Sequence, residues 1–551
     1  RQLEGGGWWV LGMAFEDLPL RGSGGGSFED ITLVGEDIVI QFLQPEDVRP
    51  RVFRVPRAQV NIDERRLAFD ASVRLPDDLG RQVRVSATQL LDVPPEERNW
   101  DITLDGDDLS LGGWAQLHPV SRELVVAGEG DIDLSLVVAD RSVRRATAGI
   151  DLFDVGLVNG KEFEVGGRIE HDRSADGWLV AAEDLVIATE DHAWPESSLR
   201  AEAGTDADGG IEMLDLRATY LNLDDNVLLL PLLPQERREQ LQALAPSGEI
   251  RGLGVTVSGL GGEAPAFRVE ADLDDVGFAA GNERPGMRGF TGYINGDRAG
   301  GRLELRSRDL IIELPQAMTE PVDIAAASGT LLWRRSGERT TILSDGIDIA
   351  NPVFDSRSGF ELILDSSGGA PNIDLTTTYR IGDVNDMVRY LPRLLMKERL
   401  YNWFQRAMVA GSIDRGTVRL RGPLDKFPFD DGEGRFLVEG TARNLTLRYQ
   451  PQWPAAEQAE VDIVLDGMRL YSVRNRSSIA GNVAVDANIE IADLRNPVLT
   501  IDALTSGTLE TLRRFAVQSP INGFTGGNLE RLSMAGDASF RLDLTVPLRN
   551  T

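Results

Sequence analysis

"GRIEHDRSADGWLVAAEDLVI" (Gly167–Ile187) is followed, at an offset of 125 residues (292 − 167), by "GYINGDRAGGRLELRSRDLII" (Gly292–Ile312). Both stretches contain Gly, Ile, Asp-Arg, a polar turn, two alternating apolar residues and Asp-Leu-x-Ile in the same order, and they align without a gap. Alternation of apolar and polar residues is typical of a half-buried β-strand. Each stretch therefore predicts a β-hairpin, with a turn at Asp172-Arg173 or at Asp297-Arg298.

The same alternation recurs along the chain. Examples are "FRVEADLDDVGF" (267–278), "FELILD" (360–365), "GTVRLRG" (416–422) and "GNVAVDANIEI" (481–491). Strands buried on both faces of a parallel sheet would instead form unbroken apolar runs. The sequence therefore predicts a mainly β fold of antiparallel strands, each with one apolar and one charged face.

A longer repeat surrounds the hairpins. The segments "AGIDLFDVGL" (148–157), "VEADLDDVGF" (269–278) and "VEGTARNLTL" (438–447) are three versions of one strand. We interpret the chain as a partial N-terminal segment (1–147), a first repeat (148–268), a second repeat (269–437) and a partial third repeat (438–551).

A sheet with one apolar face has to bury that face. It can do so as a string of sandwiches or as one curled sheet, and no Pro- or Ser-rich linker separates the repeats. At ~13 residues per strand and turn, the chain holds roughly forty strands, and open sheets rarely exceed about ten without curling or splitting. We predict one long antiparallel sheet, curled lengthwise into an open apolar groove, with a few short amphipathic helices.

The apolar positions of the repeated strands are the expected lining of this groove. Trp178 and Val180 of the first hairpin correspond to Leu303 and Leu305 of the second. The predicted lining residues are Ile169, Trp178, Val180, Leu185, Ile187, Phe267, Val269, Leu273, Ile294, Leu303, Leu305, Leu310, Ile312, Phe436, Val438, Leu445 and Leu447. The tandem Leu310-Ile311-Ile312 leaves the facing ambiguous, because neighbours in a strand point to opposite faces.

Three segments predict helices: 234–245, 393–409 and 508–517. In the second, an apolar stripe consists of Leu400, Trp403, Phe404, Ala407 and Met408. Such a stripe normally packs on the rest of the fold. The alternative, an interfacial helix in contact with lipid, lacks the Lys/Arg-rich polar face that would support it.

The composition limits the possible partners and chemistry. A net charge of −31 argues against nucleic acid, which requires a basic surface. The three histidines (His118, His171 and His192) have no ligand-like spacing, and there is no cysteine, which argues against a metal site. No nucleophile elbow, phosphate loop or dinucleotide fingerprint occurs, so we expect no catalytic residue, no cofactor and no enzyme activity.

Short polar motifs have structural explanations. "TDADGG" (205–210) lacks the glutamate that closes a calcium loop and predicts a turn. Asp224 and Asn226 recur as Asp383 and Asn385 ahead of predicted helices, which indicates capping. The Trp-Pro pairs at 194–195 and 453–454 are expected to anchor crossovers between strands.

Segments 390–454 and 175–202 carry a resemblance to a known family. They contain the entry Tyr390-Leu391-Pro392, Trp403, Phe427-Pro428-Phe429 and the two Trp-Pro pairs. In these blocks the chain resembles the AsmA-like proteins of Gram-negative envelopes, most closely the YhdP branch, over most of residues 100–551.

The resemblance implies a function and a location. It implies a long periplasmic β-groove, tethered to the inner membrane in the full-length protein, that carries phospholipid between the inner and outer membranes. No stretch of this chain approaches the ~20 apolar residues of a membrane helix. The chain also begins with Arg1, so we expect a middle portion of such a bridge. A structural or adhesive envelope β-rod, with a closed apolar core and no ligand, remains the alternative.

Overall fold

The structure, a computed structural model, describes residues 9–10, 13–14, 31–42, 50–94, 98–117, 121–139, 142–174, 176–190, 192–206, 209–225, 235–262, 265–281 and 284–548. The chain divides into two compact units, Arg1–Glu202 and Ala203–Thr551. Each unit is described by itself. The four-segment division of the chain remains a prediction.

The first unit consists almost entirely of strands. Its strands are β1 (Trp9–Val10), β2 (Met13–Ala14), β3 (Ile31–Phe42), β4 (Arg51–Ile62), β5 (Arg66–Arg74), β6 (Gly80–Leu90), β7 (Trp100–Ser110), β8 (Val125–Ala139), β9 (Ser142–Leu157), β10 (Glu162–Arg173) and β11 (Gly177–Thr189). Strand β12 (Ser197–Thr205) contains the division between the units. Two short helices, α1 (Leu111–Ala115) and η3 (Ser121–Glu123), lie between β7 and β8.

The second unit continues the pattern and carries more helices. Its strands are β13 (Ile211–Asn222), β14 (Ser247–Ser258), β15 (Ala266–Phe278), β16 (Gly286–Asp297), β17 (Gly300–Glu313), β18 (Val322–Ser336), β19 (Arg339–Ala350), β20 (Phe354–Asp365), β21 (Asn372–Ile381), β22 (Met408–Pro423), β23 (Arg435–Leu447), β24 (Ala456–Asp466), β25 (Arg469–Ile479), β26 (Asn482–Ile491), β27 (Val498–Thr508) and β28 (Asp537–Pro547). Its helices are α3 (Gln235–Leu244), α4 (Val384–Met387), η5 (Val388–Tyr390), α5 (Glu398–Ala407), η6 (Leu424–Lys426), α6 (Leu509–Val517), α7 (Ile521–Phe524) and η7 (Asn528–Arg531).

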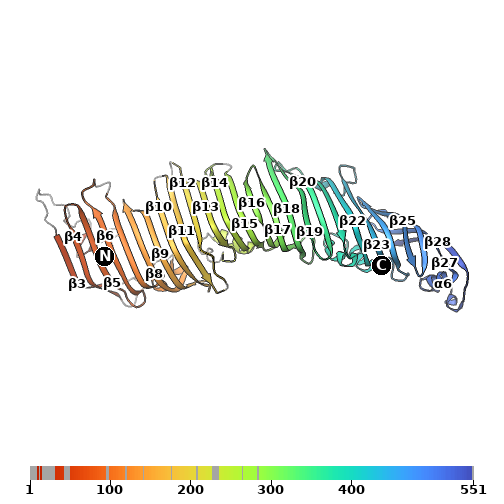
Figure 1. Cartoon of the computed structure of the whole chain (residues 1–551), viewed down its shortest axis with the longest axis horizontal. Coiled ribbons are helices and arrows are strands. Elements are labelled where there is room, and N and C mark those ends of the chain that lie inside the picture. Colours follow the sequence, from red (N-terminus) through yellow and green to blue (C-terminus); the bar gives the residue numbers. More distant parts are fainter. Residues whose placement is uncertain are drawn as a thin grey trace. The chain divides into compact units, whose positions relative to one another are not determined.

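Within each unit, strands that follow one another in the sequence pair antiparallel and form an open sheet (Figure 1). The prediction of a mainly β, antiparallel fold with few short helices is confirmed. Both hairpins of the repeated stretch form, β10–β11 and β16–β17. The described part of the chain contains 26 strands from β3 to β28 rather than roughly forty, because most of them are longer than the estimate assumed.

A β-bulge interrupts many of these strands. Ten non-glycine residues inside strands have a positive φ, and they are Asp37, Asp108, Asp154, Asp184, Asp275, Asp309, Asn444, Gln458, Arg474 and Asp486. Asp and Asn tolerate the left-handed conformation better than other side chains, which explains why they predominate. A bulge inserts one extra residue into a strand, so it bends the strand and increases its local twist.

Glycines of neighbouring strands make room for some of these bulges. A Cβ atom at Gly248 of β14 would lie 2.4 Å from the carbonyl oxygen of Asp275, and at Gly289 of β16 it would lie 2.8 Å from that of Asp309. Both glycines also have a positive φ, at 92° and 83°. The bulged backbone can therefore approach its neighbour only where the neighbour lacks a side chain.

The three predicted helices exist, with shorter bounds. Helix α5 begins at Glu398, and residues 393–397 form turns rather than helix. Trp403 and Ala407 of its apolar stripe are buried, with Leu400 and Phe404 packed against the same cluster, while Met408 begins strand β22. The stripe therefore packs on the sheet, as expected. Helix α3 has no fully buried residue, and its Leu241 and Leu244 are half-buried.

Candidate functional site

The apolar faces of strands β15–β19 meet in one hydrophobic cluster. Its buried members are Phe290, Leu310, Ile324 and Ala327. Partly buried side chains packed against them include Leu273, Leu303, Leu305 and Ile312, all predicted lining residues. The register explains this grouping, because Leu310 lies opposite Ile324 of β18 and Ile312 lies opposite Met287 of β16. The predicted lining residue Ile294 lies opposite Leu303.

The bulge at Asp309 settles which residues of β17 share a face. Residues 303, 305 and 307 alternate regularly, and Asp309, at a φ of 53°, then adds one position. As a result, Leu310 and Ile312, rather than Asp309 and Ile311, continue the face of Leu303 and Leu305. Leu310 is 4% exposed and belongs to the cluster of strands β15–β19.

The first unit has the same arrangement on the β10–β11 hairpin. Ile169 lies opposite Ala182, and Val165 lies opposite Ile187 across the register shift at Gly166/Arg168. Asp184 is the bulged residue, with a φ of 53°. Trp178 and Val180 before it therefore share a face with Leu185 and Ile187 after it. Leu185 is buried, whereas Val180 is exposed.

Strand β23 contains segment 438–447, the third version of the strand that also occurs in β9 and β15. Its bulge is at Asn444. Leu445 is buried together with Ala442, Ile413 and Val461, and Leu447 packs against this group. Phe436 and Val438 are half-buried. The structure thus brings Leu445 and Leu447 together.

The predicted lining residues of strand β15 are more exposed to solvent than those of strands β17 and β23. Phe267 is 45% exposed, and Val269 is half-buried opposite Val255 of β14 and Gly296 of β16. Leu273, nearer the bulge at Asp275, packs against the cluster of strands β15–β19. The apolar side chains of this face are therefore most covered near the bulges.

The opposite face carries ion pairs between neighbouring strands and, for Arg306 of β17 and Asp272 of β15, across one intervening strand. Arg306 reaches Asp272 at 3.4 Å, Arg380 reaches Asp355 at 2.6 Å, and Arg541 reaches Asp502 through two hydrogen bonds of 2.8 and 2.6 Å. The hydrogen bonds from Arg541 lower the pKa of Asp502 below its ordinary value. This face is suited to water, and exposed pairs of this kind contribute little stability individually.

Strands β23–β28 curl around a small apolar cavity. In a flat sheet, β23 and β28 would be five strand spacings apart, roughly 24 Å. Leu445 of β23 and Leu542 of β28 nevertheless line the same cavity of about 40 Å³. Alanines supply much of the wall, namely Ala456, Ala459, Ala484, Ala487 and Ala503.

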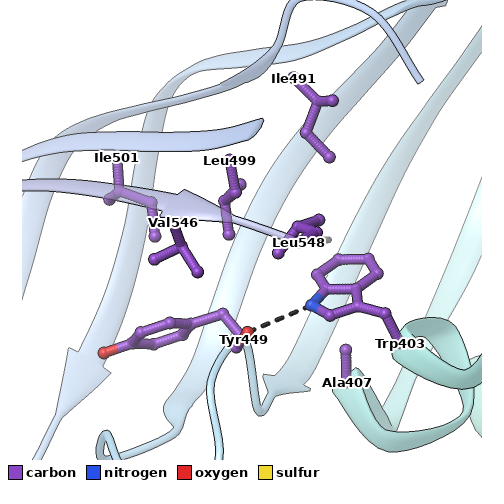
Figure 2. Packing of buried hydrophobic residues seen from close by; sticks show 8 residues of the cluster. All are labelled: Trp403, Ala407, Tyr449, Ile491, Leu499, Ile501, Val546 and Leu548. Atoms are coloured by element: carbon purple, nitrogen blue, oxygen red, sulfur yellow. Dashed lines mark hydrogen bonds between the residues drawn. The ribbon is translucent and has the colours of Figure 1, made fainter. Parts of the chain in front are cut away.

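Helix α5 packs against the far strands of this curled section. Trp403 and Ala407 lie in one buried cluster with Ile491, Leu499 and Val546, although α5 immediately precedes β22 in the chain (Figure 2). The Trp403 indole Nε1 donates a hydrogen bond to the backbone oxygen of Tyr449 at 3.1 Å. Phe515 of α6 is buried in a neighbouring cluster, with its ring centroid 5.7 Å from that of Trp453 and 5.6 Å from that of Phe540.

The polar motifs largely have the structural roles expected of them. The Asp383 carboxylate caps α4 by accepting a hydrogen bond from the Asn385 backbone N–H at 2.8 Å. Asp224 instead accepts one from the Gly248 N–H at 3.0 Å, and Asn226 lies outside the described residues. Asp206 closes a turn by accepting a hydrogen bond from the Gly210 N–H.

The histidines and the first Trp-Pro pair do not come together in one site. His171 lies inside β10 opposite Val180 and is half-buried. His118 lies outside the described residues. Trp194 is buried just after β11, and its backbone N–H donates to the Ile187 oxygen at 2.7 Å. Among the residues that the structure describes, no group of three or more acidic or histidine side chains could hold a metal ion.

Comparison with known proteins identifies the family. A sequence profile described as "YhdP protein" matches residues 28–551. The chain belongs to the YhdP family. The curated "Intermembrane phospholipid transporter YhdP" of Escherichia coli (strain K12) is 24% identical over 538 residues, which cover 93% of this chain and 41% of that protein. The chain therefore spans about two fifths of the length of this relative.

No solved structure matches the chain. Within its described ranges, no helix is both long and apolar enough to cross a membrane. The YhdP family resemblance noted on segments 390–454 and 175–202 is confirmed, and the match extends further toward the N-terminus than those blocks indicated.

Two features of this YhdP family member were missed in the sequence. One is the bulge, which moves the apolar pattern by one position after an Asp or Asn. The recurrent Asp-Leu-x-Ile could have indicated the position of this bulge. The other is the cavity of strands β23–β28. Its alanines could have indicated unfilled space, but no local pattern shows that β23 and β28 approach each other.

Proposed function

We propose that this chain is a non-enzymatic segment of a lipid conduit. In this proposal, it carries phospholipid acyl chains along the apolar sheet face between the inner and outer membranes of a Gram-negative envelope. The supporting observation is the set of bulges that keep Leu303, Leu305, Leu310 and Ile312 on one face of a single strand. The Escherichia coli relative is an intermembrane phospholipid transporter, which supports phospholipid as the cargo.

The energetics favour such a face. Each methylene removed from water contributes about 0.8 kcal/mol, so a sixteen-carbon chain resists crossing water by roughly 12 kcal/mol. An acyl chain that moves from one apolar stretch to the next remains desolvated. The charged opposite face, with its Arg–carboxylate pairs, keeps the protein itself in water.

The location and partners follow from the same proposal. The segment would lie in the periplasm, tethered to the inner membrane through other parts of the full-length protein. Contacts with both membranes, and with envelope proteins, would be made by those parts. No catalytic step is required of the chain, because transfer along an apolar face breaks no covalent bond.

One observation favours the alternative of a closed structural β-rod. Around strands β23–β28, helices α5 and α6 fill the curled section and leave a cavity of only about 40 Å³. If the whole apolar face were filled in this way, no whole lipid could pass along it. The exposed Val180 and Phe267 argue against that for strands β11 and β15.

Site-specific photocrosslinking in cells separates the two functions. Benzoylphenylalanine would replace Leu305 or Ile312 on the apolar face, with Arg306 and Ile311 as matched positions on the opposite face of the same strand. We expect radiolabelled phospholipid adducts at 305 and 312 and few at 306 and 311. Adducts at none of the four positions would support the structural rod, and equal adducts at all four would contradict the assigned face.

A charge on the lining provides a second test. Leu303→Asp combined with Leu305→Asp places carboxylates where acyl chains would pass, so we expect adducts at position 312 to fall strongly. Arg308→Asp adds a carboxylate on the opposite face of β17 and is the matched control. Unchanged adducts in the double variant would show that lipid does not follow this face.

A further inference from the structure

The cavity of strands β23–β28 contains a polar group without a partner. Tyr449 lines the cavity, and its side chain is only 2% exposed. Its hydroxyl makes no hydrogen bond with any described residue. Figure 2 shows the Tyr449 ring beside Val546 with its hydroxyl directed away from Trp403. A buried hydroxyl without a hydrogen-bond partner is destabilising, so its presence in a core calls for an explanation.

A second unpaired hydroxyl lies beside the same wall. Thr505 is 1% exposed, and its Oγ1 also has no partner among the described residues. It lies directly opposite Ala484, one of the residues that line the cavity. The Tyr449 hydroxyl lines the cavity, and the Thr505 hydroxyl lies opposite its wall; two unpaired hydroxyls this close indicate a space shaped for something that brings hydrogen-bond acceptors.

The surroundings restrict the chemistry of that ligand. The wall consists mainly of Leu, Ile, Val and Ala side chains, in which a charged group would be poorly solvated. Arg476 is among the lining residues, but it lies opposite Glu460 in the β24–β25 register and is exposed. Burial raises the pKa of Tyr449, so its hydroxyl stays a neutral donor at physiological pH.

We propose that this cavity binds the ester end of an acyl chain, with the Tyr449 hydroxyl donating a hydrogen bond to the ester carbonyl. An ester is a neutral acceptor attached to an apolar chain, which matches an apolar wall that carries a neutral donor. The rest of the chain would lie along the adjoining cluster of Ala442, Leu445 and Val461. This inference rests on the proposed function, and it assigns a holding position within the conduit.

The size of the cavity fits a partial occupant. A space of about 40 Å³ corresponds to roughly three water molecules, which matches an ester group with a neighbouring methylene rather than a whole lipid. Water is the competing occupant. However, a water molecule needs two to four polar partners. Besides Tyr449, the polar lining residues are Asn475, Arg476 and Ser477, and Asn475 already bonds to Ser472 and to the Ala487 oxygen.

The test compares two phospholipids of equal chain length. One is a diester and the other its diether analogue, which lacks the carbonyls, and both carry a photoreactive diazirine next to the linkage. After irradiation with the full chain, mass spectrometry maps the adducts. Because one hydrogen bond is worth about fivefold in affinity, we expect the diester to label residues 445–503 about fivefold more than the diether. We expect equal labelling of residues 303–312.

Variants assign that preference to the hydroxyl. In Tyr449→Phe the preference at 445–503 should disappear, while labelling at 303–312 stays unchanged. Tyr379→Phe is the matched control, because the Tyr379 hydroxyl already donates to the Glu439 backbone oxygen at 3.2 Å and should leave the preference intact. Thr505→Val shows how much of the labelling preference for the diester depends on the second hydroxyl.

The outcomes separate this inference from the proposed function. No adduct in either region would remove both. Adducts at 303–312 with no preference at 445–503, or a preference that survives Tyr449→Phe, would overturn the ester site alone. Displacement of the diester from residues 445–503 by a free fatty acid would identify the ligand as a fatty acid rather than a phospholipid. This result would overturn the ester assignment. A lower melting temperature of lipid-free Tyr449→Phe would show that water already pairs with the hydroxyl, and it would also overturn the assignment.

Discussion

The bulge at Asp309 offers the sharpest test of how the sheet is built. Asp309→Val places a β-branched side chain at a φ of 53°. The left-handed conformation costs a non-glycine residue about 1–2 kcal/mol, and a β-branched side chain cannot offset this by local hydrogen bonding as Asp can. Opening of the β16–β17 hairpin should therefore become about 5- to 30-fold more frequent.

Hydrogen–deuterium exchange resolves this change along the chain. Amides of β16 and β17 should exchange faster in Asp309→Val by that factor, while those of β25–β28 should not change, because β17 pairs with β16 and β18 and not with those strands. Asp309→Gly is the matched control, since glycine adopts this φ without a steric penalty. If Val and Gly at position 309 gave the same exchange, the bulge would not depend on this conformation, and the assigned face of Leu310 would lose its support.

Two further predictions concern the second unit. The lowered pKa of Asp502 means that its pairing with Arg541 contributes stability above the ordinary carboxyl pKa and loses it as pH falls through the folded value. Asp502→Asn should therefore lower the melting temperature slightly at pH 6 and not at pH 2, as followed by circular dichroism; an equal effect at both would contradict the pairing. Ala407 is 0% exposed, so Ala407→Leu should overpack the α5 cluster and cost about 1–3 kcal/mol. Gln405→Leu on the exposed side of α5 is its control, and equal melting temperatures of the two variants would place α5 off the sheet.

Much of the fold could be predicted because each strand carries its own signal. Alternation in Leu303 and Leu305 shows a half-buried strand without reference to any other part of the chain, and turn residues mark where the strand ends. The positions after the bulge could not be assigned in the same way. Strict alternation places Ile311 with Leu305, whereas the left-handed Asp309 places Leu310 there.

Tertiary contacts of the helices lie beyond what local pattern can show. The apolar stripe of α5 was visible in the sequence, but its partners Leu499 and Val546 lie some hundred residues or more downstream and are reached only because the sheet curls. Tyr449 could not be singled out from the sequence, because an unpaired hydroxyl has no signature there.

Because each strand pairs with the strand before it and the strand after it, such a protein can change in size by whole hairpins. Each hairpin depends on the strand before it and the strand after it, so stability is close to a sum of nearest-neighbour terms. Removing or duplicating one whole hairpin would shift its neighbours into contact without creating a new kind of interface. The apolar face would then shorten or lengthen by about 10 Å, two strand spacings. In the proposed conduit, the number of hairpins would therefore set the distance that the chain covers.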